Sequence, residues 1–69
     1  MKLGKYKHFK GNIYEVIAIG KHSETSEELV IYKSSEDDVW VRPKVMFLEI
    51  VERENYKGPR FRLIERNEE

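Results

Sequence analysis

A chain of 69 residues forms one domain at most, near the lower size at which a hydrophobic core can outweigh the entropy of ordering the backbone. The composition is 39% hydrophobic and 38% charged, which favours a compact core under a charged surface over disorder. There is no cysteine, which excludes disulfides and thiolate zinc sites as stabilising elements. The net charge of zero argues against a dedicated nucleic-acid binder, because such domains usually carry a basic surplus.

The chain begins without a hydrophobic signal segment and contains no apolar run long enough to cross a bilayer. We therefore expect a cytoplasmic protein.

The first part of the chain predicts two strands and a polar loop. Residues 1–11 predict a short extended segment that ends in a turn. Residues 13–19 are apolar on both alternating faces, which is typical of a strand covered on both sides, and Gly20 then allows a bend or bulge. Residues 21–28 include no apolar side chain, and we expect a loop there.

Residues 29–33 and 39–42 predict the two strands of a hairpin, joined by the acidic loop 34–38. A register with Lys33 opposite Val39 gives the following partners: Tyr32 with Trp40, Ile31 with Val41, and Val30 with Arg42. We expect Ile31, Val39 and Val41 to face the core. The other face would then be an aromatic surface, Tyr32 and Trp40, with the guanidinium of Arg42 at its end.

Pro43 cannot donate to a ladder and ends this strand. The rest of the chain predicts a helical turn at 43–48, extended structure at 49–53, a turn or hairpin loop at 54–59, a last strand at 60–64 and a frayed end at 65–69. The core is expected to contain the aromatic residues and one methionine: Phe9, Tyr14, Met46, Phe47 and Phe61.

About five short strands with one short 3₁₀ or helical turn predict an all-β fold over residues 1–69. We expect a small, strongly bent SH3-like β-barrel. The main alternative is an open meander with a helix packed on it.

Several separate motifs occur in order: "YKHFKGNIYEVIAIGKHSET", "LVIY", "VWVRPKVMF" and "PRF". Together they resemble the bacterial family of small domains of unknown function DUF1653, from about residue 6 to residue 64. The resemblance implies no activity. It implies that the family pattern includes Tyr6, His8, Phe9, Gly11, Tyr14, His22, Ser23, Glu24, Thr25, Tyr32, Trp40, Arg42, Pro43, Met46, Phe47, Pro59, Arg60 and Phe61. The acidic "KSSEDDV" departs from the longer, glycine-containing and more apolar loop usual there, so a ligand that contacts this loop would be bound differently.

We expect a non-catalytic binding module that recognises a peptide segment or a small anionic ligand through an aromatic and arginine face. The candidate ligand-binding residues are Tyr6, His22, Glu24, Thr25, Tyr32, Trp40, Arg42 and Arg60. An arginine beside aromatic rings can hold an anion bidentately, or it can pair with an internal carboxylate such as Glu15 or Glu24. A protein or peptide partner is favoured, and no cofactor is expected.

Two other functions remain open. RNA or single-stranded nucleic acid could bind a basic edge formed where the two ends of the chain lie side by side, built from Lys2, Lys5, Lys7, Lys10, Arg60 and Arg62. A hydrolase would use His22 and Glu24 as acid and base, although adjacent residues of one loop rarely reach the geometry of a triad. A metal site from His8, His22 and Glu24 lacks any short ligand spacing, so none is expected.

Overall fold

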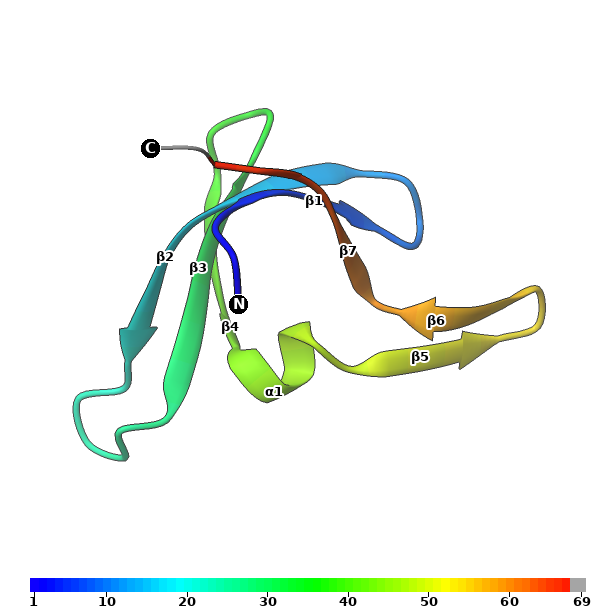
Figure 1. Cartoon of the computed structure of the whole chain (residues 1–69). Helices are drawn as coiled ribbons and strands as arrows, with labels where there is room; N and C mark the ends of the chain where they lie inside the picture. Colours follow the sequence, from blue (N-terminus) through cyan, green and yellow to red (C-terminus); the bar gives the residue numbers. More distant parts are fainter. Residues whose placement is uncertain (68–69) are drawn as a thin grey trace.

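The computed structural model describes residues 1–67 and has seven strands and one short helix (Figure 1). The elements are β1 (Gly4–His8), β2 (Ile13–Lys21), β3 (Glu28–Ser34), β4 (Val39–Pro43), α1 (Lys44–Phe47), β5 (Ile50–Arg53), β6 (Tyr56–Pro59) and β7 (Phe61–Arg66). The larger sheet has five antiparallel strands in the order β4-β3-β2-β1-β7, and β5 and β6 form a separate hairpin. The all-β fold with a single helical turn is confirmed. Both sheets are open, and β4 and β7 are the edges of the larger one.

The predicted register of the β3–β4 hairpin is confirmed. Lys33 lies opposite Val39, Tyr32 opposite Trp40, Ile31 opposite Val41 and Val30 opposite Arg42. The alternation of side chains along two short strands was sufficient to set this register, because a slip by one residue would move every side chain to the other face.

The predicted faces of this hairpin are wrong. Val30 and Tyr32 are buried in the core, whereas Val41 is 59% exposed. The ring of Tyr32 packs against Phe47 and Phe61, with centroids 5.4 Å and 5.6 Å away. Tyr32 is buried because its ring packs on other aromatic rings, whereas Trp40 on the same face stays 50% exposed, so only the Val30 and Tyr32 part of that face belongs to the core.

The core is built mainly from aromatic rings. Phe47 of α1 and Phe61 of β7 stack with centroids 4.0 Å apart and planes at 2°. The buried cluster consists of Tyr6, Val16, Val30, Tyr32, Phe47 and Phe61. Phe47 and Phe61 thus fill the predicted core positions.

Other predicted core residues lie at its margin or outside it. Tyr14 is half-buried and meets Tyr32 edge to face at 5.5 Å, and Phe9 is half-buried and stacks on Tyr56 at 5.4 Å. Met46 is 45% exposed, contrary to expectation, because neighbouring residues of a single helical turn point in different directions and Phe47 takes the inward one.

Two register shifts bend the larger sheet. Ile17 is an extra residue between the pairs of β2 with β3, whereas Gly20 pairs regularly with Leu29. The bend predicted at Gly20 therefore occurs earlier in the strand. A second shift lies between β1 and β7, where a Cβ at Gly4 would overlap the carbonyl oxygen of Glu65. Such bulges increase strand twist, and together they curve the sheet over α1.

The C-terminal strands extend further than predicted. β6 pairs with β5 up to Pro59, so the turn expected over 54–59 contains only Glu54 and Asn55. β7 continues to Arg66, and the Asn67 N–H donates to the carbonyl oxygen of Leu3 at 3.0 Å. Fraying of 65–67 is therefore wrong, and residues 68–69 lie outside the described part.

Two hairpin loops close in the same way. In the β1–β2 loop the His8 N–H donates to the Asn12 carbonyl and the Gly11 N–H to the His8 carbonyl, both at 2.8 Å. In the β3–β4 loop the Ser34 N–H donates to the Asp38 carbonyl and the Asp37 N–H to the Ser34 carbonyl, both at 3.0 Å. The residue two positions before the closing strand has a positive φ in each loop, 109° at Gly11 and 67° at Asp37.

The longer loop of residues 22–27 also contains a residue with a positive φ, Ser26 at 63°. It closes through the His22 N–H to the Glu27 carbonyl at 2.8 Å and the Ser26 N–H to the His22 carbonyl at 2.9 Å. The predicted loop at 21–28 is thus confirmed in its middle, between the end of β2 and the start of β3.

The pair of matched loops predicts stability changes of opposite sign. Asp37→Gly should raise the free energy of unfolding by about 0.5–1 kcal/mol, because glycine adopts the left-handed conformation without the steric cost of a Cβ. Gly11→Ala should lower it by about 1 kcal/mol, since its Cβ meets no atom within 4 Å and only the backbone conformation is penalised. Urea unfolding of both variants checks this. If the free energy of unfolding changed in the same direction in both variants, the shared loop conformation would be contradicted.

Candidate functional site

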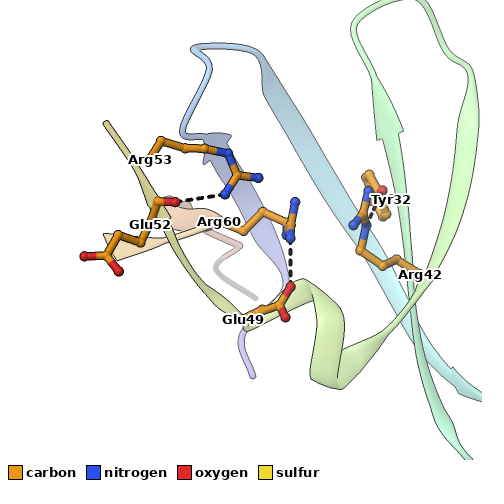
Figure 2. A network of polar contacts seen from close by, with 6 residues as sticks. All are labelled: Tyr32, Arg42, Glu49, Glu52, Arg53 and Arg60. Carbon is orange, nitrogen blue, oxygen red and sulfur yellow. Dashed lines mark hydrogen bonds and ion pairs between the residues drawn. The ribbon is translucent and has the colours of Figure 1, made fainter. Parts of the chain in front are cut away.

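Arg42 of β4 is half-buried and lies against the aromatic core (Figure 2). Its Nε donates to the Tyr32 hydroxyl at 3.2 Å, and its guanidinium carbon lies 5.7 Å from the centroid of the Phe61 ring. Within residues 1–67 no carboxylate forms an ion pair with it, so neither Glu15 nor Glu24 is its partner. The guanidinium is thus oriented by neutral groups, and its charge is not balanced by an adjacent carboxylate.

Arg60, between β6 and β7, has the internal partner that Arg42 lacks. Its Nη2 donates to Glu49 Oε1 at 2.7 Å, and its side chain is only 19% exposed. The backbones of the two residues are also joined, since the Arg60 N–H donates to the Glu49 carbonyl at 2.9 Å. The Nε of Arg60 is buried and has no hydrogen-bond partner in the described chain.

His8 is a further polar residue beside Phe61. Its ring lies 4.9 Å from the Phe61 ring, edge to face, and 4.6 Å from Phe9. The Nδ1 accepts the N–H of Lys10 at 3.1 Å, so a neutral imidazole carries its proton on Nε2. We name His8, Arg42 and Arg60, together with Phe61, the Phe61 cluster.

The environment of His8 disfavours its charged form. Desolvation by burial lowers the pKa of His8 below its ordinary value of 6.5, and the positive charges of Arg60, Arg42 and Lys10 lower it further. Sequence reasoning named His8 in the family pattern and in a metal site that is not expected, but did not place it among the ligand-binding residues. Its position beside Phe61 arises from the pairing of β1 with β7, which brings the two residues opposite each other.

Trp40, by contrast, belongs to a different surface. It is 50% exposed and lines a hollow of about 370 Å³. The other walls of the hollow are Asn12, Ile13, Tyr14, Ser34, Ser35, Glu36 and Asp38. Arg42 does not line it. The predicted joint surface of Trp40 and Arg42 is therefore divided between an open, acidic hollow and the margin of the core.

The free edge of the larger sheet at β4 is apolar. Because the Ser34 N–H donates to the Asp38 carbonyl, the pairs Tyr32–Trp40 and Val30–Arg42 are the hydrogen-bonded ones. The N–H and C=O groups of Val39 and Val41 therefore point away from β3, along the open edge. Both side chains are 59% exposed, contrary to the core positions expected for them.

The other edge strand is protected by charge. β7 exposes Arg62, Glu65 and Arg66 among its apolar residues, a device that discourages pairing with another strand. The exposed stretch 39–41 of β4 contains no charged residue. The two edges therefore differ in their capacity to accept a further strand.

The loop containing His22, Glu24 and Thr25 is exposed and bonded to itself. The Nδ1 of His22 accepts the N–H groups of Glu24 and Thr25 at 3.1 Å and 3.4 Å, and Thr25 Oγ1 accepts the Glu27 N–H at 3.2 Å. The nitrogen that a triad carboxylate would orient is occupied by the backbone. This geometry lends no support to the hydrolase alternative.

Tyr6 and Tyr32 were expected on a ligand-facing surface, but both are core residues. The Tyr6 hydroxyl donates to the Lys2 carbonyl at 2.6 Å, and desolvation by burial raises the pKa of Tyr6. Tyr32 acts on the site indirectly, through its hydrogen bond with Arg42.

The first and last strands do lie side by side, as the nucleic-acid alternative requires. However, Lys5 lies opposite Glu15 on one side and Glu65 on the other, with its Nζ 3.6 Å from the Glu65 carboxylate. Only Lys7 and Arg62 remain as a facing basic pair in this part of the sheet. The structure thus adds no extended basic surface in favour of that alternative.

In the part of the chain that is described, no three histidine or acidic side chains are placed to hold a metal ion. The same residues include no helix of the length and hydropathy needed to cross a bilayer.

Fold and surfaces together define a small all-β domain with an open apolar sheet edge and an arginine–aromatic cluster. The family model for DUF1653, described as a protein of unknown function, matches residues 4–63, and the chain belongs to this family. The crystal structure of a DUF1653 protein from Bordetella bronchiseptica has the same fold, with a TM-score of 0.87 and 23% identity over 100% of this chain and 94% of that one. A search of curated proteins gave no match.

The environment of His8 predicts a loss of stability in mild acid. Since its pKa is lower in the folded chain than in the unfolded chain, the unfolded chain binds the proton first as the pH falls. The stabilising contribution is present above about pH 6.5 and is lost as the pH drops through the folded pKa. Urea unfolding between about pH 7.5 and pH 5 should therefore show a falling free energy of unfolding.

The matched control is His8→Asn, which does not titrate but keeps an acceptor for the Lys10 N–H. Its free energy of unfolding should be lower at neutral pH, because ring contacts are lost, but its pH dependence in this window should be flatter. An unchanged slope in His8→Asn would show that His8 is not the responsible group.

Proposed function

We propose that this domain is a non-catalytic binding module in which an extended peptide segment adds as a further strand to the edge of β4. The observation that carries this proposal is the outward direction of the Val39 and Val41 backbone groups along residues 39–41 of β4, a stretch without charged residues. Strand addition uses main-chain hydrogen bonds for affinity and pockets for alternate side chains for specificity.

The hollow beside Trp40 supports a preference for a basic side chain in the peptide. Glu36 and Asp38 are exposed on its wall, and Trp40, which is 50% exposed, lines it as well. A lysine or arginine there would gain ion pairing and a cation–π contact. The peptide expected is therefore extended and rich in β-branched residues, with one basic residue near the Trp40 end.

An SH3-like closure of the bent sheet belongs to the same proposal, because small barrels of that kind present aromatic grooves to extended peptides. A cytoplasmic location of the domain is also proposed. Peptide addition requires that any such closure leave the β4 edge unpaired, as it is in the five-stranded sheet.

The test is selection from a random-peptide library followed by affinity measurement on two variants. Val41→Pro removes the outward N–H without removing a bond to β3, and edge strands tolerate proline at such positions. It should weaken peptide binding by about tenfold or more, through the lost hydrogen bond and the bulk of the ring.

Val41→Thr is the matched control, since it keeps the backbone donor and nearly the same shape, and it should bind with little change. Thermal unfolding of both variants confirms that they fold. Equal affinity of the wild type and Val41→Pro would contradict strand addition. So would a library without enrichment, or a stable dimer of the free protein that covers the edge.

A further inference from the structure

We infer that the Phe61 cluster is a binding site for a small oxyanion, a carboxylate or phosphate group, held by Arg42 and Arg60 with His8 as a further donor. The inference rests on other residues than the peptide edge. The side chain of Arg42 lies on the core side of β4, whereas strand addition would use the backbone of Val39 and Val41.

The charges of the cluster are unbalanced. Of the two guanidinium groups, only that of Arg60 is paired with a carboxylate, that of Glu49, while no carboxylate among residues 1–67 pairs with Arg42. Lys10 adds positive charge near His8. A half-buried charge without a counter-charge carries part of its desolvation cost uncompensated, and a bound anion would remove that cost.

Hydrogen-bond donors remain in the same place. Arg42 uses its Nε on Tyr32, which leaves both terminal nitrogens of the fork without a protein partner among residues 1–67. The buried Nε of Arg60 has no partner there either. Because Nδ1 of His8 is occupied by the Lys10 N–H, Nε2–H is the donor that the neutral ring offers.

Arg42 and His8 lie against the same ring, and Arg60 precedes it in the chain. The guanidinium carbon of Arg42 lies 5.7 Å from the Phe61 centroid and the His8 ring 4.9 Å from it, while Arg60 is next to Phe61 in the chain. In Figure 2 the guanidinium groups of Arg42 and Arg60 lie on the same side of α1. The positive charges of both arginines also lower the pKa of His8, after the larger effect of desolvation by burial.

An oxyanion matches this set of donors. Its oxygens can accept the end of the Arg42 fork bidentately, and its charge offsets the positive surplus that now disfavours a proton on His8. A bound oxyanion should therefore raise the pKa of His8. The direction is opposite to the effect of the two arginines, so the histidine reports occupancy of the site.

The experiment follows the ring resonances of His8 by NMR in sodium chloride, sodium acetate and sodium phosphate at equal ionic strength. We expect a saturable shift of these resonances and a higher pKa of His8 in at least one oxyanion, relative to chloride. Acetate and phosphate serve as separate arms, which show whether the site takes a carboxylate or a phosphate. The absence of a saturable effect in both, beyond that of chloride, would overturn the inference.

Two variants locate the effect. Arg42→Lys keeps the positive charge but loses the planar fork, and should weaken the anion affinity by about tenfold. Arg62→Gln removes an exposed cation on the opposite face of β7 and should leave the response unchanged. An equal response of the His8 resonances in the wild type and Arg42→Lys would show that Arg42 is not part of the site. If Arg42→Lys fails to fold, the titration of the wild type still tests whether the site binds an oxyanion.

Discussion

The stack of Phe47 on Phe61 is the contact on which the rest of the structure depends. It joins the single helical turn after β4 to the first residue of β7, two elements that no sheet hydrogen bond connects. Tyr6 and Tyr32 meet Phe47 edge to face from β1 and β3, at 5.3 Å and 5.4 Å. In a chain of this length, one aromatic cluster thus replaces the layered aliphatic core of larger domains.

The same ring links the core to the proposed anion site. One arginine and one histidine lie against Phe61, so the packing that stabilises the fold also holds two polar groups at the margin of the core. Their positions are therefore set by the fold and not by loop conformation, which favours a preformed site. The proposed peptide edge lies on the other side of β4, so a single strand carries both proposed functions through different atoms.

Sequence reasoning reached the register of the β3–β4 hairpin but not its orientation. Alternation specifies which residues share a face, and both faces here are apolar, so the pattern is symmetric. The face that is buried is the one that carries Tyr32, because Tyr32 packs against the rings of Phe47 and Phe61, and these two residues lie outside the hairpin. His8 was missed as a site residue for the same reason, since its neighbours come from β4 and β7. The family assignment, resting on local motifs, needed no such contacts.

The most direct test of the central claim, that the β4 edge is an open recognition strand, is amide hydrogen exchange residue by residue. In the free protein we predict fast exchange at Val39 and Val41 and slow exchange at Trp40 and Arg42, following the alternation of the ladder. Saturation with a selected peptide should slow exchange at Val39 and Val41. Protection of these two amides in the free monomer, or continued fast exchange in the complex, would contradict the account.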